Sequence, residues 1–383
     1  WSRSSAVRVE FMDQSNRDID RIVDIAKSHM ASRFGTLYVS AFQSEEEDED
    51  ERPELDEPLD LELTTPDPVR FNPLPRTKPL PLVAVDSGVQ ELGTLSGGGL
   101  ALAVRAAAVL LRGESRPIVL RYHTGGIVID EGNRLPVFRA IGERLGQPTL
   151  WVDITEDNRT ELADKTPLRP NEVKSAVRSF VERMVTEEAI GLLSSLGGGT
   201  LLLDGALPPS SYDLPNQYVV TMLKECAWKK IDVVALSKKT RYTVGGRPIG
   251  ALFDDDPAFV GYAAIRKYVD SPRARRESDY RNISAAKEVY AARFAIGPTA
   301  MTFRVDVHNS ISSTPKEVIE RVYTDTPLYG GYPVPLIMAH QYSSFLGLEA
   351  PMLAADLVAR HGLRFEADRT MDVLFQPFNA FGK

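Results

Sequence analysis

Two short stretches of the same design constrain this chain most, because each ends a buried strand on an aspartate. The stretch from Leu201 to Leu207 (LLLDGAL) has three consecutive leucines with glycines close on either side, which predicts a fully buried strand. The stretch from Leu82 to Gly88 (LVAVDSG) repeats this design earlier in the chain. A carboxylate at the end of a buried strand needs a cation, a hydrogen-bond donor or a raised pKa. Asp86 and Asp204 therefore suggest a shared metal site.

Composition indicates an ordinary globular protein. Of the 383 residues, 43% are hydrophobic and 26% are charged, which allows a sizeable core. The sequence contains no run of about 18 apolar residues, so no transmembrane helix and no membrane association are predicted. The single cysteine, Cys226, excludes an internal disulfide and a cysteine-based zinc site. Such cysteine usage fits a reducing compartment, and a cytoplasmic location is expected.

Charge is unevenly distributed along the chain. The net charge of −8 argues weakly against a nucleic-acid partner, but seven acidic residues follow one another from Glu45 to Glu51. Without that run the remainder is close to neutral, so local basic patches are compatible with the composition. The run leads into a proline-rich stretch, and residues 44–79 are expected to form an exposed loop or insertion. The functional alternative is a mimic of nucleic acid that guards a basic groove.

The segment that begins at Pro81 predicts an antiparallel meander. Three strands with short connections are expected, followed by a helix. Ser87 and Gly88 are expected to break or bend the first strand. Their predicted bounds are Leu82–Val85, Leu100–Leu111, Arg116–Tyr122 continuing to Ile127–Ile129, and Leu135–Leu145 for the helix. An imperfect apolar stripe predicts a further helix near the N-terminus, between Val7 and Phe34.

The next segment predicts parallel strands. A long helix from about Asn171, its expected cap, to Leu196 precedes the Leu201 strand, and a strand, helix and strand in succession imply a right-handed parallel crossover. The other expected elements are a helix at Asn216–Trp228, strands at Asp232–Leu236 and Met301–Val307, and a helix at about Pro335–Leu346. This order is that of a ribonuclease-H-like sheet. The expected fold class is α/β, with an antiparallel meander followed by parallel strands, flanking helices and helical additions.

The long helix offers a third carboxylate. At 100° per residue, Glu188 falls near the centre of the apolar face, Glu187 near its edge and Glu182 further round. An acid on a buried face is costly unless it is paired, so Glu188 is expected to approach Asp86 and Asp204. Clustered carboxylates suit Mg²⁺ or Mn²⁺ and can hold two ions for attack on a phosphodiester. The simpler alternative is that each aspartate bonds its own backbone in a turn.

A second group of candidates follows strand ends and turns. Glycines and prolines between Tyr329 and Pro335 predict a tight entry into a helix that presents His340, which could bind a metal, move a proton or serve only structure. Lys238, Lys239 and Arg241 could contact phosphates or form a solvated turn. A denser basic region with interleaved tyrosines suits a single strand or an ordinary loop; it holds Arg266, Lys267, Arg273, Arg275, Arg276 and Arg281 with Tyr262, Tyr268 and Tyr280.

Four stretches together resemble the NurA nuclease family. They are Asp86 to Gly88, Leu203 to Leu207, Leu236 to Lys238, and Gly331 to His340, within a span from Pro81 to His340. The resemblance assigns the two strand acids to Asp86 and Asp204, the tyrosine to Tyr332 and the histidine to His340. The helical acid is Glu188 by phase, with Glu187 and Glu182 as neighbours. The chain departs from the family in reading Asp-Ser-Gly where Asp-Gly-Ser is usual.

The resemblance implies a Mn²⁺-dependent DNA nuclease, with Mg²⁺ as the alternative ion. Its expected catalytic residues are Asp86, Glu188, Asp204, Tyr332 and His340, and its metal ligands come from Asp86, Glu187, Glu188, Asp204 and His340. It further implies 5′-to-3′ exonuclease and single-strand endonuclease activity in DNA-end resection and double-strand-break repair, as a homodimer bound to the hexameric HerA translocase.

The expected organisation has four parts: an N-terminal helical segment (1–43), the acidic insertion (44–79), the nuclease domain (80–350) and a C-terminal extension packed on the core (351–383). Two other functions fit the same residues. The chain could be a non-catalytic DNA-binding adaptor of a translocase, or a ribonuclease-H-like enzyme that acts on RNA–DNA hybrids.

Overall fold

The first three long strands form the predicted antiparallel meander. β3 (Leu82–Leu95), β4 (Leu100–Leu111) and β5 (Ile118–Ile129) pair in chain order. The predicted break at Ser87 and Gly88 is wrong, because both residues pair with β4 and the strand continues through them. The computed structural model describes residues 17–31, 36–39, 66–72, 79–96, 98–113, 116–145, 170–207, 216–238, 240, 242–270, 283–297, 300–346 and 349–365.

Two parallel strands extend the meander and confirm the predicted order. β6 (Gly199–Asp204) pairs in parallel with β3, and β7 (Ile231–Ser237) pairs in parallel with β6. The spatial order β5-β4-β3-β6-β7 is that of a ribonuclease-H-like sheet. α4 (Pro170–Ser195) leads into β6, and α5 (Asn216–Trp228) forms the crossover to β7. Since α4 already includes Pro170, Asn171 lies inside the helix and does not precede it as a cap.

The sheet continues beyond β7 through strands that the sequence predicted only in part. Antiparallel pairing joins β7 to the predicted β13 (Thr302–His308) and then to β12, β10 and β2. β1 pairs with the far end of β3, on the same side of β3 as β6, and β16 pairs with β1. β2 comes from the stretch expected to be a loop, and the acidic run lies outside the described residues. The further bounds are β1 Thr36–Val39, β2 Val69–Arg70, β8 Thr243–Val244, β9 Arg247–Pro248, β10 Gly261–Ala264, β11 Val269–Asp270, β12 Glu288–Arg293 and β16 Arg364–Phe365.

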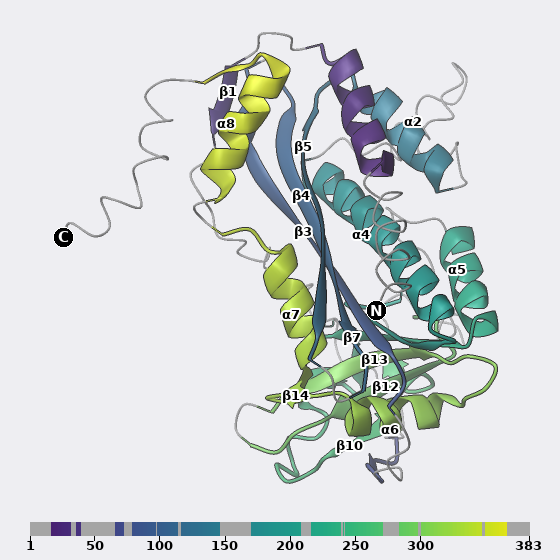
Figure 1. Cartoon of the computed structure of the whole chain (residues 1–383). Coiled ribbons are helices and arrows are strands. Elements are labelled where there is room, and N and C mark those ends of the chain that lie inside the picture. The colour runs from purple at the N-terminus through teal and green to yellow at the C-terminus, as the bar shows by residue number, and fades with distance from the viewer. Residues whose placement is uncertain are drawn as a thin grey trace, which may run out of the picture.

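Helices cover both faces of this sheet, and α4 and α7 (Val334–Ser343) lie on opposite sides of it (Figure 1). α4, α5, α2 (Arg134–Arg144) and a helix at residues 17–29 pack in the core that contains Val83 and Val85. α7 and α6 (Pro315–Asp325) pack in a second core with Leu82 and Ala84. Because alternate side chains of a strand point to opposite faces, the position of a strand residue decides which helices it meets.

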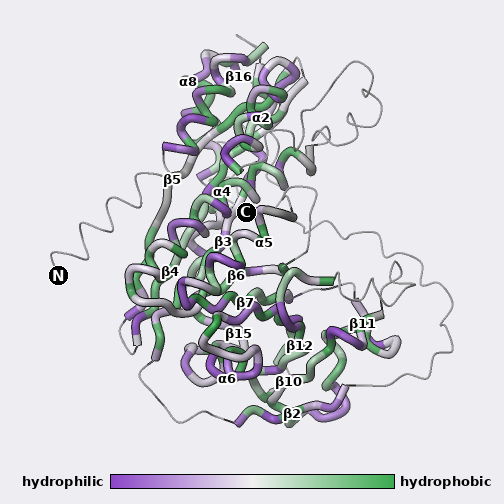
Figure 2. The backbone as a smooth tube through the Cα atoms, turned by 90° about the vertical axis from the view of Figure 1, so that its right-hand side faces the viewer, coloured by the Kyte–Doolittle hydropathy of each residue, from purple (hydrophilic) through white to green (hydrophobic). Residues whose placement is uncertain are grey.

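The long meander also sets the shape of the molecule. β3, β4 and β5 run between one end built around β10 and β12 and another end that carries α2 and α8 (Glu349–His361) (Figure 1). Polar and apolar residues alternate along α8, which packs its apolar side on a third core (Figure 2). Of the helices in the described ranges, none is long and apolar enough to cross a membrane. The junction of the meander with β6 and β7 lies between these two ends.

Candidate metal centre

Strand register brings Asp86 and Asp204 level with each other on neighbouring strands. Val85 pairs with Leu203 in the parallel ladder between β3 and β6, so the next residue on each strand is an aspartate. Asp86 and Asp204 are each two residues beyond a core residue, Ala84 and Leu202, so their side chains point to the same face of the sheet, which α7 covers. Asp86 is 8% exposed, and the side chain of Asp204 is 19% exposed. The predicted convergence of the two strand acids is therefore present.

His340 completes a group of three potential ligands. Its Nδ1 atom lies 2.9 Å from Oδ2 of Asp86, and the hydroxyl of Ser343 donates to the same oxygen at 2.9 Å. One ligand atom from each of Asp86, Asp204 and His340 lies within 4.8 Å of the others. Ser343 was not predicted, although its spacing of three residues from His340 on a helix places both on one face.

Hydrogen bonding keeps the carboxylate of Asp86 ionised. Burial raises its pKa, but the hydrogen bonds from His340 and Ser343 outweigh burial and leave the pKa below its usual value. The same bond to Asp86 raises the pKa of His340. The pair therefore favours a negative carboxylate beside an imidazole that gains a proton more readily than a free histidine.

Lys238 and Tyr332 flank Asp204. The ammonium nitrogen of Lys238, one residue beyond β7, lies 3.1 Å from Oδ2 of Asp204 and 4.5 Å from the centre of the Tyr332 ring. Tyr332 is 8% exposed and packs against Phe303 at 5.4 Å between ring centres. Burial, and then the charge of Asp204, raises the pKa of Tyr332, so its phenol stays protonated at neutral pH.

The glutamates of α4 do not join this group. Glu187 accepts hydrogen bonds from Arg144 at 2.8 Å and from Tyr218 at 2.6 Å, and Glu182 accepts one from Ser87 at 2.8 Å. Glu188 is 6% exposed, so its predicted place on the buried face is confirmed. However, α4 packs on the face of β3 opposite to Asp86, and within the described ranges no α4 glutamate belongs to the cluster of possible ligands. The expected approach of Glu188 to the aspartates is thus absent, and its catalytic role stays a prediction.

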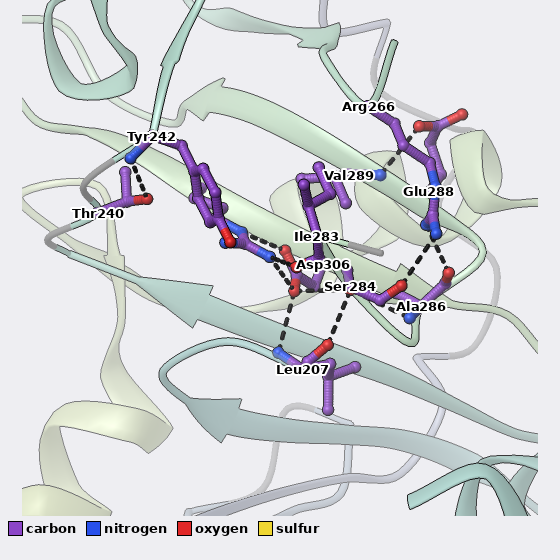
Figure 3. A network of polar contacts seen from close by, with 11 residues as sticks. Leu207, Thr240, Tyr242, Arg266, Ile283, Ser284, Ala286, Glu288, Val289 and Asp306 are labelled. Atoms are coloured by element: carbon purple, nitrogen blue, oxygen red, sulfur yellow. Dashed lines mark hydrogen bonds and ion pairs between the residues drawn. The ribbon is translucent and has the colours of Figure 1, made fainter. Parts of the chain in front are cut away.

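The structure describes only some of the basic side chains that were predicted to contact nucleic acid. Lys239 and Arg241 lie outside the described residues, as do residues 271–282 of the denser basic region. Arg266 donates to the carbonyls of Ser284 and Ala286, an internal contact visible in Figure 3. Tyr262 is 3% exposed and donates to Glu320. These two side chains are used inside the fold, which contradicts their prediction as contacts to a single strand.

A buried polar network holds the chain segment that follows Asp204. The backbone N–H of Leu207 donates to Asp306 at 2.9 Å, and the hydroxyl of Ser284 donates to the same carboxylate at 2.8 Å (Figure 3). Arg304 donates to Asp306 through two nitrogens at 2.8 and 2.9 Å. Because Asp306 is fully buried, its charge requires these partners. The network therefore anchors the turn after β6 to β13.

The donor set suits a divalent cation. Two carboxylates and an imidazole are ligands that Mn²⁺ accepts, and Mg²⁺ is compatible with the carboxylates. Two negative aspartates on adjacent strands repel each other, and Lys238 offsets only part of that charge. A cation between Asp86, Asp204 and His340 would relieve the repulsion directly. The residues present therefore fit a metal site.

A comparison with protein families decides the relationship. A family model of the NurA domain matches residues 80–345. The chain belongs to the NurA family. This match covers more than half of the chain and includes the two strand aspartates, Tyr332 and His340, so the resemblance inferred from the four stretches is confirmed.

Solved structures include several distant NurA relatives. A NurA nuclease from Sulfolobus solfataricus is 14% identical with a TM-score of 0.40, over 77% of this chain and 87% of that one. NurA bound to dAMP and manganese is 12% identical with a TM-score of 0.32, over 72% and 87%. An endonuclease V from Bacillus subtilis is 11% identical with a TM-score of 0.28, over 75% and 88%. Curated proteins gave no match.

Proposed function

We propose that this NurA-family chain is a metal-dependent DNA nuclease whose ion is held by Asp86, Asp204 and His340. The observation that carries the proposal is the approach of their ligand atoms to within 4.8 Å in a chain that matches the NurA domain. Mn²⁺ is the proposed ion because it accepts both carboxylate and imidazole. A bound divalent ion supplies a polarised phosphate oxygen and an activated water for phosphodiester hydrolysis.

The surrounding side chains have separate parts in this proposal. Ser343 and His340 hold Asp86 in its ionised form, which is the form that binds a cation. His340, with its side chain 55% exposed, is open to solvent and offers a ring nitrogen to the ion. Lys238 lies beside Asp204 and offers a donor to a phosphate, and the buried ring of Tyr332 supports its ammonium group at 4.5 Å. These roles support a site that binds the scissile phosphate.

Family membership is the basis on which we propose a finer activity. We infer 5′-to-3′ exonuclease and single-strand endonuclease activity on DNA ends, in end resection and double-strand-break repair. We infer as partners a second copy of the chain and a hexameric translocase of the HerA type. A cytoplasmic location agrees with such a role.

Substitution of the strand acids tests the nuclease proposal. Asp86→Asn and Asp204→Asn should each lower Mn²⁺-dependent cleavage of end-labelled DNA on the order of a hundredfold or more, because each removes a negative metal ligand. Mn²⁺ should also raise the melting temperature of the wild type but not of Asp204→Asn. Asp255→Asn, at a side chain 76% exposed, is the matched control and should retain activity.

Undiminished cleavage by both aspartate variants would overturn this site. DNA binding that is equal with and without chelator, together with no cleavage, would indicate the adaptor function. Degradation of RNA–DNA hybrids in preference to matched DNA would indicate the ribonuclease-H-like function. Labels at the 5′ and the 3′ end separate the two polarities of exonuclease digestion.

A further inference from the structure

An exposed aromatic residue stands beside the candidate metal centre without a part in the site described above. Tyr329 is 77% exposed and ends β14 (Leu328–Tyr329), which pairs with β15 (Tyr332–Pro333). Within this hairpin Tyr329 is the direct antiparallel partner of Tyr332. Single exposed apolar side chains are common on proteins and need no function. The position of Tyr329 opposite a residue of the site is what distinguishes it.

The hairpin holds Tyr329 in a defined position. Gly330 and Gly331 have φ values of 58° and 87°, the positive values that a two-residue type I′ turn requires. A Cβ atom at Gly331 would lie 3.2 Å from Cβ of Ala295, so the turn rests closely on the chain beneath it. Directly opposed residues of an antiparallel pair project from the same face. Tyr329 therefore projects from the same face of the hairpin as Tyr332, with its ring left open to solvent.

A line of contacts leads from the metal centre to this ring. Lys238 contacts Asp204 at 3.1 Å and lies 4.5 Å from the centre of the Tyr332 ring, and Tyr329 is the neighbour of Tyr332 across the hairpin. A phosphate at the centre would lie near the positive charge of Lys238. Aromatic side chains placed beside a cationic backbone contact are typical of sites for single strands.

We propose that Tyr329 stacks on a nucleobase of a single strand whose phosphate lies at the metal centre. This inference rests on the proposed nuclease function and adds a subsite for an unpaired base. Stacking uses the π face that every base has, so the subsite tolerates any sequence. Bases in a duplex are already stacked on each other, so the subsite favours a strand that has been separated.

Binding measured without cleavage tests the subsite. Affinity for a fluorescent single-stranded oligonucleotide is measured by anisotropy with Ca²⁺ in place of Mn²⁺, under conditions in which the labelled strand stays intact, for the wild type, Tyr329→Ala and Tyr329→Phe. Tyr329→Ala should bind about tenfold more weakly, and Tyr329→Phe within about twofold of the wild type, because the ring and not the hydroxyl is required. The matched control is Trp228→Ala, at an aromatic residue that is 76% exposed at the end of α5. Trp228 precedes the first residue of β7, whereas Lys238 follows the last one. It should bind as the wild type does.

An abasic oligonucleotide with the same phosphates separates stacking from charge. The difference between wild type and Tyr329→Ala should vanish on it. Unchanged affinity of Tyr329→Ala, or an equal loss on the abasic strand, would overturn the subsite even if the wild type cleaves DNA with Mn²⁺. Conversely, a wild type that binds through Tyr329 but cleaves nothing would support the subsite and contradict the nuclease. Equal melting temperatures of the variants would show that the hairpin substitutions leave the fold intact.

Discussion

Asp86 owes its negative charge to two donors from a single turn of α7. The hydrogen bonds from His340 and Ser343 lower its pKa against the effect of burial, so the carboxylate is ready for a cation. Lys238 lies 3.1 Å from Oδ2 of Asp204 and places a positive charge beside it. At the residue scale, His340 and Ser343 thus offset the effect of burial on the pKa of Asp86.

His308 is a residue at which burial prevails instead. The pKa of His308 is lowered to about 4, mainly by burial and secondly by the charge of Lys287. The unfolded chain, with a histidine pKa near 6.5, then binds the proton more tightly than the folded chain. The contribution of His308 to the free energy of unfolding should therefore be fully present above about pH 6.5. It should be lost as the pH decreases towards 4, which lowers the free energy of unfolding by on the order of 1–3 kcal/mol.

Urea unfolding at pH 7 and at pH 4.5 measures this effect. His308→Gln should lose less stability than the wild type over the same interval, because glutamine cannot bind the proton. Other titrating groups are common to both proteins and cancel in the comparison. Equal losses in wild type and variant would contradict the prediction.

At the scale of elements, α7 reaches β3 only because Gly88 has no side chain. A Cβ atom there would lie 2.5 Å from the carbonyl oxygen of Ser343, at the end of the helix that carries His340. The β6 turn is fixed from the other face, where Leu207 is bound to Asp306. The two aspartates are therefore positioned by elements from both sides of the sheet.

Gly88→Ala should displace the end of α7. Backbone atoms cannot rotate away as a side chain can, so the overlap should cost about 1–3 kcal/mol of stability and weaken both hydrogen bonds to Asp86. Mn²⁺ affinity, measured by calorimetric titration, should fall several-fold. Gly250→Ala is the matched control, because no atom lies within 4 Å of its added Cβ, and it should change stability by no more than about 0.5 kcal/mol. Wild-type Mn²⁺ affinity in Gly88→Ala would contradict this account.

At the scale of the whole molecule, the long meander joins two ends that carry different cores. One end is built around α8 and the third core, and the other around β10 and β12 (Figure 1). The candidate centre lies where the meander meets the parallel strands.

The proposed assembly is tested on the intact chain. Light scattering should give a mass of twice the 42.3 kDa of one chain, and a HerA-type hexameric ATPase should co-elute with that dimer. Asp204→Asn should assemble as the wild type does, because the proposed metal ligand is not an assembly contact. A monomer at micromolar concentration that does not co-elute with the ATPase would contradict both partners.

Local sequence determined the central strands and helices and the two strand acids. Buried runs that end on an aspartate predicted β6 and the start of β3, and the helix Asn216–Trp228 was predicted with its observed bounds. These features depend on periodicity and on glycine stops over a few residues, which the chain carries by itself. The order of strands followed from the alternation of strands and helices.

Only the tertiary structure decided how those elements share the site. Pairing with β4 carried β3 through Gly88, and the register between β3 and β6 set Asp86 level with Asp204. The packing of α4 and α7 on opposite faces assigned the histidine, and not the glutamates, to the aspartates. The phase of a side chain is a local property, but the face that a helix covers depends on how distant parts of the chain pack together.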